Sequence, residues 1–253
     1  MKSMQMKALA LAVLGLAGFG VAGSAMACDA TNLAAWNGGV AAITGGTVTA
    51  VAPGLDASAC AMSSSLGTGA TSQASVIDTS PNNEPRYRFQ FLVDPNAHVT
   101  NLTAQDSVAL FTATNQTAAH GRKTIIQVFL VPTSTAGIDR ISFSYSCNNG
   151  TTYRCIHTSP VNLVSGVNRI EFDVQMATSG ANGSIRYWIN APAGGTEPAP
   201  SDSVTGIDNS AWVGTKLASL GLGTPAPHWS SAHHGEAVLF DTFDSRRQTY
   251  IGH

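Results

Sequence analysis

The sequence predicts an all-β protein, an antiparallel sandwich of two sheets, and three observations support this prediction. Short segments in which apolar and polar residues alternate recur along most of the chain. Brief turns rich in Gly, Ser, Asn and Pro separate them. No helical period appears between them. Because parallel strands need long crossover connections, closely spaced strands favour antiparallel pairing.

The first 27 residues have the pattern of a secretion signal. Lys2 and Lys7 precede an apolar run at residues 8–22, and Ala25-Met26-Ala27 supplies the small residues that signal peptidase accepts. We expect cleavage before Cys28 and a location outside the cytoplasm: secreted, periplasmic or on the cell surface. Cleavage before a cysteine leaves lipidation of Cys28 as an open alternative, although such signals usually carry a larger aliphatic residue where Ala25 stands.

The remaining 226 residues, 28–253, fit a single β-sandwich domain. Without the two lysines of the signal the chain has 11 basic and 15 acidic residues, a net charge of −4. Nucleic acid is therefore not an expected partner, because phosphate binding needs a concentrated basic face. The apolar run of the signal is too short for a confident membrane span, and no later stretch reaches the required length.

All four cysteines follow the predicted cleavage site, where oxidation is the default state. Cys147 and Cys155 flank the turn sequence NNGTTYR and can face each other across a hairpin, which leaves Cys28 to pair with Cys60. The chain-entropy model gives roughly 2.5 kcal/mol for the small ring and about 4 kcal/mol for the large one. Lipidation of Cys28 would leave Cys60 as an odd thiol, so the even count favours the disulfide.

Each predicted strand shows alternation or an apolar run. Residues 86–93 carry aromatic side chains at every second position, and residues 141–147 place three serines opposite an apolar face. Residues 53–73 predict a loop or a thin edge strand, and residues 210–220 a short helical turn. The predicted strands are residues 46–52, 87–93, 108–114, 124–131, 141–147, 170–176, 185–189 and 237–243.

The strand at residues 237–243 closes the predicted fold. It is apolar and aromatic, and its charged residues lie at and beyond its end. An unpaired hydrophobic edge would invite aggregation, so we expect it to pair with strands upstream.

Five segments, taken in order, resemble bacterial secreted proteins with a concanavalin A-like or laminin G-like jelly roll. They are EPRYRFQFLVD, VALFTA, VNRIEFDVQM, SIRYWIN and FDTFDSRRQTYIG, the last containing an FDxFxSRR motif. The resemblance covers nearly all of the exported chain. It implies secretion and an antiparallel two-sheet jelly-roll sandwich of the lectin and glucanase type, and it implies activity far less strongly, because many functions share this fold.

The segment Glu171-Phe172-Asp173-Val174-Gln175 is a degenerate catalytic motif. Concanavalin A-like glycoside hydrolases carry an E-x-D-x-(x)-E motif on one strand, and Glu171 and Asp173 match its first two acids. Gln175 stands at the third position and cannot protonate a leaving oxygen, whereas retaining hydrolysis needs two carboxyl groups. We therefore predict a structural role for these residues and no catalytic residue in the motif.

The charged residues at the end of the chain are predicted to form a structural network that holds the final strand. Asp241 and Asp244 lie close in sequence to Arg246 and Arg247, whose guanidinium groups pair well with carboxylates. A site for an acidic ligand at the two arginines is the alternative.

Two sets of residues have side chains of the kinds that bind metal ions. We expect no cofactor, and calcium is the alternative. The oxygen donors before the predicted helical turn lack the spacing of a dedicated calcium loop. The histidines near Trp229 lack HExxH spacing, so zinc is not expected. The oxygen donors are Asp202, Asp208 and Asn209, and the histidines are His228, His233 and His234.

Four aromatic residues in polar, loop-like surroundings are candidate platforms for sugar rings, whose apolar faces suit an aromatic plane. They are Trp36, Tyr153, Trp212 and Trp229. With no GxSxG elbow and with the cysteines assigned to disulfides, the sequence predicts a protein that is not an enzyme and that binds an extracellular polysaccharide or glycan. A secreted glycoside hydrolase-like protein and a self-associating surface subunit are the alternatives.

Overall fold

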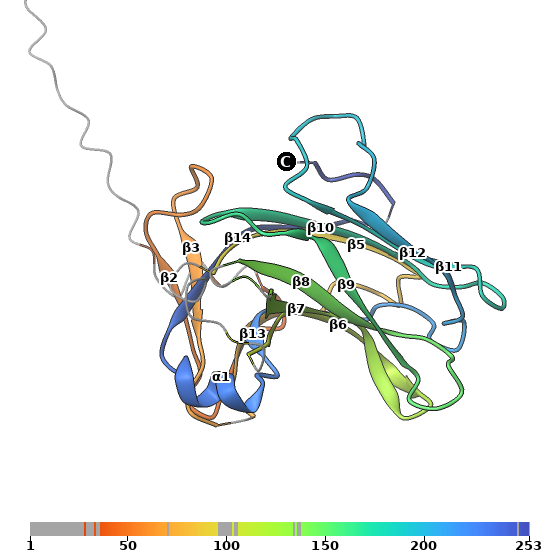
Figure 1. Cartoon of the computed structure of the whole chain (residues 1–253), viewed down its shortest axis with the longest axis horizontal. Coiled ribbons are helices and arrows are strands. Elements are labelled where there is room, and N and C mark those ends of the chain that lie inside the picture. Colours follow the sequence, from red (N-terminus) through yellow and green to blue (C-terminus); the bar gives the residue numbers. More distant parts are fainter. Residues whose placement is uncertain are drawn as a thin grey trace, which may run out of the picture.

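A computed structural model describes residues 28, 33, 36–69, 71–95, 103, 106–133, 135, 138–246 and 248–252. It confirms the predicted fold class: two antiparallel seven-stranded sheets form a β-sandwich (Figure 1). The predicted signal, residues 1–27, lies outside the described residues. No helix in the described part of the chain is both long and apolar enough to cross a membrane.

Each sheet is built from strands that are far apart in the sequence. In spatial order, sheet A consists of β1 (Val40–Ile43), β4 (Gln73–Asp78), β13 (Leu217–Gly223), β6 (Val108–Ala119), β7 (Arg122–Pro132), β8 (Asp139–Ser146) and β9 (Arg154–Asn162). Sheet B consists of β12 (Asp202–Ile207), β11 (Gly183–Ile189), β10 (Asn168–Gln175), β5 (Arg86–Asp94), β14 (Ala237–Arg246), β3 (Ala61–Ser65) and β2 (Thr47–Val51).

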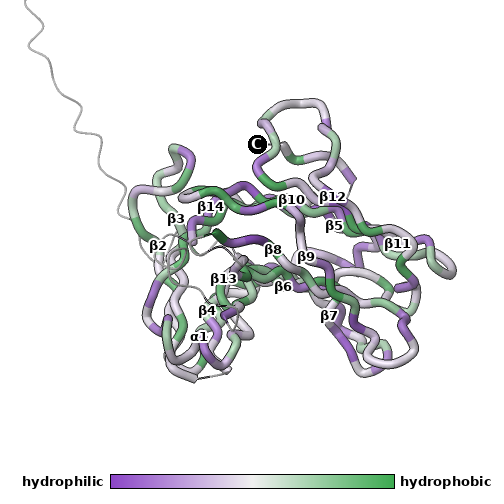
Figure 2. The backbone as a smooth tube through the Cα atoms, viewed as in Figure 1, coloured by the Kyte–Doolittle hydropathy of each residue, from purple (hydrophilic) through white to green (hydrophobic). Residues whose placement is uncertain are grey.

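The core fills the space between the sheets with the apolar half of each alternating strand. Figure 2 shows hydrophobic stretches along strands of both sheets. Phe89 of β5 stacks on Phe111 of β6 with ring centroids 3.8 Å apart, which joins sheet B to sheet A. Phe172 of β10 stacks on Phe89 from the neighbouring strand at 5.4 Å. Burying each such ring stabilises the fold by about 1.5–3 kcal/mol, so these strands fix which face of each sheet points outward.

The strand β14 confirms that the last predicted strand pairs with segments upstream. It lies inside sheet B, between β5 and β3, and its register places Phe240 opposite both Val93 and Met62. The pairing with β5 shifts between Asp241 and Asp244, which marks a bulge.

One prediction about local structure was right in part and one was wrong. The segment at residues 53–73, predicted as a loop or a thin edge strand, contains β3, which lies inside sheet B between β14 and β2. In β3 the small side chain of Ser64 is fully buried and donates a hydrogen bond to the Ala74 carbonyl at 2.6 Å. The predicted helical turn at residues 210–220 overlaps β13 instead. The only helix among the described residues is α1 (Pro227–Ala232), which begins with a proline at its first turn and buries Trp229.

Both predicted disulfides are present. The bond between Cys28 and Cys60 ties residue 28 to the segment before β3, and the bond between Cys147 and Cys155 closes the turn between β8 and β9.

Candidate functional site

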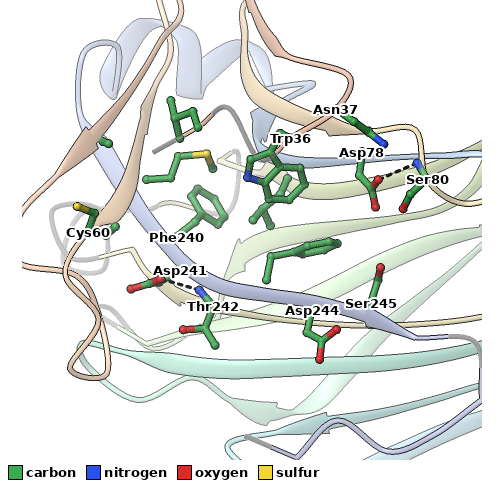
Figure 3. A pocket seen from close by; sticks show the side chains of 16 residues that line it. Trp36, Asn37, Cys60, Asp78, Ser80, Phe240, Asp241, Thr242, Asp244 and Ser245 are labelled. Atoms are coloured by element: carbon green, nitrogen blue, oxygen red, sulfur yellow. Dashed lines mark hydrogen bonds between the residues drawn. The ribbon is translucent and has the colours of Figure 1, made fainter. Parts of the chain in front are cut away.

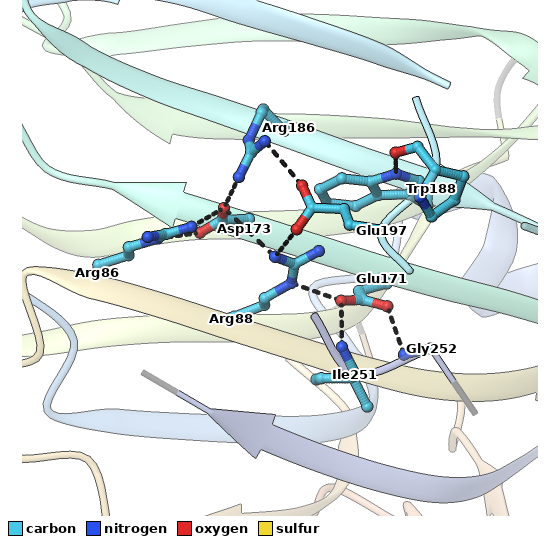
Figure 4. Close-up of polar contacts among 10 residues, drawn as sticks. Arg86, Arg88, Glu171, Asp173, Arg186, Trp188, Glu197, Ile251 and Gly252 are labelled. Atoms are coloured by element: carbon cyan, nitrogen blue, oxygen red, sulfur yellow. Dashed lines mark hydrogen bonds and ion pairs between the residues drawn. The ribbon is translucent and has the colours of Figure 1, made fainter. Parts of the chain in front are cut away.

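The outer face of sheet B carries a cluster of charged residues, the sheet B charge cluster (Figure 4). Its members are Arg86, Arg88, Glu171, Asp173, Arg186 and Glu197. Asp173 accepts hydrogen bonds from Arg86 and from Arg186, the latter at 2.6 Å. Arg88 donates through Nε to Glu171 at 2.5 Å and through Nη1 to Glu197 at 2.8 Å. Every carboxylate of the cluster is therefore paired with a guanidinium group.

The segment at the end of the chain covers this cluster. The backbone N–H groups of Ile251 and Gly252 donate to the two carboxylate oxygens of Glu171 at 3.1 and 3.3 Å. The guanidinium of Arg88 lies 4.4 Å from the ring of Trp188 and 5.0 Å from that of Tyr250. Figure 1 shows the C-terminal segment and the loop that follows β11 above this face.

The E-x-D motif is thus part of a closed structural network. Glu171 is 2% exposed, so no substrate can reach it while the covering segment is in place. Burial alone would raise the pKa of Asp173, but hydrogen bonds from Arg86 and Arg186 and the charge of Arg88 hold that pKa below its ordinary value. An acid with a low pKa is a poor proton donor at neutral pH.

Two of the four candidate sugar platforms are corrected by the structure. Trp212 and Trp229 are each 1% exposed, so neither ring can offer a face to a sugar. The Trp212 indole donates to the Arg122 carbonyl at 2.9 Å, and Trp229 packs against the hydrophobic core from α1. Their Ser- and Gly-rich surroundings suggested loops, but these segments fold over the ends of the sandwich and bury the rings. Tyr153 is half-buried and stacks on His120 at 3.9 Å, which occupies one face of its ring.

Trp36 lines a cavity of about 450 Å³ at the side of β14 (Figure 3). Its ring centroid lies 4.7 Å from that of Phe243. Aspartates at three positions also line the cavity, namely Asp78, Asp241 and Asp244. We call this space the Trp36 cavity.

The predicted charge network at the end of β14 has a different partner for Asp241. The Oδ2 atom of Asp241 accepts hydrogen bonds from the Leu55 N–H at 2.7 Å and from the Ser58 hydroxyl. This aspartate therefore fastens the loop before β3 to β14. The side chain of Arg246 and all of Arg247 lie outside the described residues, so their predicted pairing stays a prediction.

A second hollow, of about 320 Å³, lies on the outer face of sheet A, and we call it the sheet A groove. It runs across β4, β13, β6 and β7, and within its lining Gln127 Nε2 donates a hydrogen bond to the Thr224 hydroxyl at 3.0 Å. Its polar side chains are all hydroxyls and amides, namely those of Gln73, Ser75, Thr112, Thr114, Thr124, Gln127, Ser219 and Thr224. The residues that line the groove thus include no ionisable group. Nothing in their sequence signalled this site, because Ser and Thr on an outer strand face are common.

A histidine held by a buried carboxylate lies close in sequence to the groove lining. His228 Nδ1 and Asp106 Oδ1 are 2.7 Å apart, and the Asp106 side chain is fully buried while that of His228 is 40% exposed. Burial alone would raise the pKa of Asp106, but hydrogen bonds from the backbone and side chain of Thr103 and from His228 hold it below its ordinary value. An ionised Asp106 fixes the proton of a neutral His228 on Nδ1, so Nε2 is left as a proton acceptor.

The residues considered as metal ligands are used elsewhere. Asp202 lies 2.9 Å from His157, and buried Asn209 accepts a hydrogen bond from the Ala177 N–H. Asp208 accepts one from the Asn148 side chain. Among the described residues, no group of three or more His, Cys, Asp or Glu side chains is arranged to hold a metal ion.

Comparison with known proteins identifies the fold. No protein-family model matches this chain, and no curated protein matches its sequence. An endo-β-1,4-glucuronan lyase from the fungus Trichoderma reesei matches with a TM-score of 0.57 at 14% identity, over 83% of this chain and 90% of that one. An alginate lyase from a Chlorella virus matches with a TM-score of 0.53 at 13% identity, over 87% of this chain and 98% of that one.

An alginate lyase from Klebsiella pneumoniae matches with a TM-score of 0.51 at 8% identity, over 80% of this chain and 84% of that one. At these identities the likeness shows a shared jelly-roll sandwich, which agrees with the concanavalin A-like architecture expected from the sequence. The prediction that the chain is not an enzyme is corrected by these matches, because the three structures on the same fold are polysaccharide lyases.

Proposed function

We propose that this protein is an exported enzyme that cleaves a uronic acid-containing polysaccharide by β-elimination, with the sugar chain bound in the sheet A groove. The observation that carries the proposal is the groove itself, an open hollow across four strands with hydroxyl and amide side chains for its polar lining. It lies on a fold shared with glucuronan and alginate lyases. The two disulfides suit an oxidising compartment, where such a substrate would be met.

The chemistry of the groove suits an extended sugar chain. Hydroxyl and amide groups both donate and accept hydrogen bonds, as sugar hydroxyls do. The side-chain amides of Gln73 and Gln127 can also donate to a uronate carboxylate, which lowers the pKa of the carbon acid beside it. A neutral lining adds no carboxylate to repel a polyanion.

Elimination fits the available groups better than hydrolysis does. Retaining hydrolysis needs two carboxyl groups about 5–5.5 Å apart with one of them protonated. Glu171 and Asp173 are locked in ion pairs, and the described groove lining has no carboxyl group. Elimination needs a base that removes the C5 proton of the uronate. The electron pair then forms the C4–C5 double bond, the bond from C4 to the glycosidic oxygen breaks, and that oxygen takes a proton.

We assign the role of the base to Nε2 of His228. Thr224 lines the groove and His228 follows it four residues later, whereas Asp106 precedes the lining residue Ala109 by three. A chain of four residues spans at most about 14 Å, so we place this pair beside the rim of the groove as part of the proposal. Asp106 would orient the imidazole and stabilise its protonated form, as a carboxylate does for a catalytic histidine.

The proposal is tested by incubating the purified exported chain with glucuronan, alginate and a neutral β-glucan. Elimination creates an unsaturated uronate that absorbs in the ultraviolet, and hydrolysis does not. We expect this absorbance to rise with at least one polyuronate and not with the glucan. His228→Asn should lower kcat by about 10²-fold or more, while His234→Asn, at an exposed histidine just after α1 whose Nδ1 lies 3.2 Å from the Ser231 carbonyl oxygen, should leave it unchanged.

Reducing ends that form without ultraviolet absorbance would show hydrolysis and reject the elimination chemistry. An absence of both signals on every polyuronate would reject cleavage of these substrates altogether.

A further inference from the structure

The Trp36 cavity forms where sheet B loses a strand beside β14. The pairing of β14 with β3 ends at Phe240 and Met62, so among the described residues the following part of β14 has no strand partner on that side. The bulge between Asp241 and Asp244 also interrupts pairing with β5, and Thr242 within it has a φ of 47°. A β-branched residue in the left-handed region is a strained conformation, of a kind that concentrates at binding sites.

The cavity offers a flat apolar surface. Trp36 and Phe243 are both half-buried, and their rings lie 4.7 Å apart at an angle of 41° (Figure 3). The other three tryptophans of the chain, Trp188, Trp212 and Trp229, are each 1% exposed. Trp36 is therefore the one tryptophan whose ring can meet a ligand. With about 450 Å³, the cavity falls in the size range of small-molecule sites.

The described residues that line the cavity carry negative charge. Asp78, Asp241 and Asp244 are among the described residues that line it, and no lysine or arginine is. Asp78 Oδ1 accepts a hydrogen bond from the Ser80 N–H at 2.8 Å, and Figure 3 shows Asp78 on the cavity wall beside Trp36. Asp241 is already engaged by Leu55 and Ser58. Asp78, which lies beside Trp36, is the carboxylate that we assign to ligand binding.

We propose that the Trp36 cavity is a binding site for a sugar residue with a protonated amino group. The pyranose ring would stack on Trp36, and the ammonium group would pair with Asp78. Aromatic rings attract both the apolar face of a sugar and a nearby cation. A uronate would be disfavoured by the aspartates. This site is separate from the sheet A groove in both position and charge, and its existence does not depend on the cleavage activity.

Tryptophan fluorescence measures binding at this site directly, because the other three tryptophans are buried. The probes are a trisaccharide of β-1,4-linked glucosamine, cellotriose as its neutral counterpart, and a triglucuronate. We expect the glucosamine trisaccharide to shift the emission and to bind at least about tenfold more tightly than cellotriose. The triglucuronate should give no shift. Raising the salt concentration should weaken binding of the glucosamine trisaccharide alone.

Two variants separate a binding role from a structural one. Asp78→Asn keeps the carbonyl oxygen that accepts from Ser80, so it preserves the fold while it removes the charge. It should bring the affinity for the glucosamine trisaccharide down to that for cellotriose and leave cellotriose binding unchanged. The matched control Asp208→Asn, in the loop after β12 at the far edge of sheet B, should change neither.

In Trp36→Phe the emission shift should disappear, and calorimetry should show weaker binding of both neutral and amino sugars. The proposal is overturned if no trisaccharide changes the fluorescence of the wild-type protein. It is also overturned if triglucuronate binds at Trp36 as tightly as the glucosamine trisaccharide, or if Asp78→Asn keeps the preference for the amino sugar.

Discussion

Two regions on the outer faces of the two sheets have opposite characters. In the sheet B charge cluster the outward side chains are charged, paired with each other and covered by the end of the chain. In the sheet A groove the polar side chains are neutral hydroxyls and amides, and the groove stays open between them. The charged cluster contains Glu171 and Asp173, which resemble a catalytic motif in the sequence, but both side chains form ion pairs within the cluster. Ionisable residues on a strand therefore indicate function only if their partners leave them accessible.

The largest effect on stability should come from breaking the sheet B charge cluster at Arg88. Arg88→Met leaves the buried carboxylate of Glu171 without its guanidinium partner. An uncompensated buried charge costs about 3–5 kcal/mol in free energy of unfolding, which urea denaturation will measure. The double variant Arg88→Met with Glu171→Gln should recover more than half of that loss. Arg154→Met, at an exposed arginine of sheet A, is the matched control and should change stability by less than about 0.5 kcal/mol.

Sheet A has a buried carboxyl group of its own, and it should make stability fall as pH rises. Asp139 at the start of β8 is buried, its Oδ2 has no hydrogen-bond partner in the described part of the chain, and burial raises its pKa from 3.8 to about 7. Its folded-state pKa is the higher one, so its stabilising contribution is complete below pH 3.8 and is lost as the pH rises to 7.

Asp139→Asn should remove this pH dependence. The variant should be more stable than the wild type at pH 8, by an amount on the order of 2–4 kcal/mol, and the difference should vanish near pH 4. Melting temperatures at a series of pH values measure this difference. Parallel curves for the two proteins would contradict the assigned pKa.

The covering segment of sheet B should make a smaller contribution. Tyr250→Ala removes the ring that lies 5.0 Å from the Arg88 guanidinium. We expect a loss of about 1–2 kcal/mol in free energy of unfolding, together with faster amide exchange at Ile251 and Gly252. Unchanged exchange at these two amides would mean that the segment stays in place without its aromatic contact.

A substitution in the sheet A groove, Gln127→Leu, should have the smallest effect on stability and a large effect on activity. Gln127→Leu loses one hydrogen bond to Thr224, worth about 0.5–1.5 kcal/mol. If the groove binds the substrate, kcat/KM on the polyuronate that is cleaved should fall by about tenfold or more. Gln175→Leu, an exposed glutamine on sheet B, is the control for the same change in chemistry and should leave kcat/KM unaltered.

The fold could be predicted where strands carry large apolar side chains in strict alternation. Phe89 and Phe91 mark β5, and Ile141 and Phe143 mark β8, because burial of such residues needs a face that repeats every two positions. The strand β13 was missed, and β3 was predicted only as a loop or a thin edge strand, because their Ser, Ala and Gly residues have weak β-propensity and are fixed by packing against neighbouring strands.

The sites were harder to predict than the strands, because they depend on register and on what covers each face. Glu171 and Asp173 stood out in the sequence, but their pairing with Arg88 and Arg186 follows from the alignment of β5, β10 and β11, which the residues themselves do not reveal. Trp36 is half-buried and lines a cavity, whereas Trp212 and Trp229 have similar local sequence and are buried. No local pattern distinguishes an aromatic residue in an open loop from one in a loop that closes the core.

The interior position of β14 also has a consequence for the order of folding. Sheet B consists of two parts, β12-β11-β10-β5 and β3-β2, and only β14 joins them. Since β14 follows every other described strand in the chain, the ribosome synthesises it after all of them. Until then the edges of β5 and β3 that it will occupy stay open to other partners, including other chains. Completing sheet B should thus be a late and slow step that chaperones would assist, because it depends on contacts between distant segments.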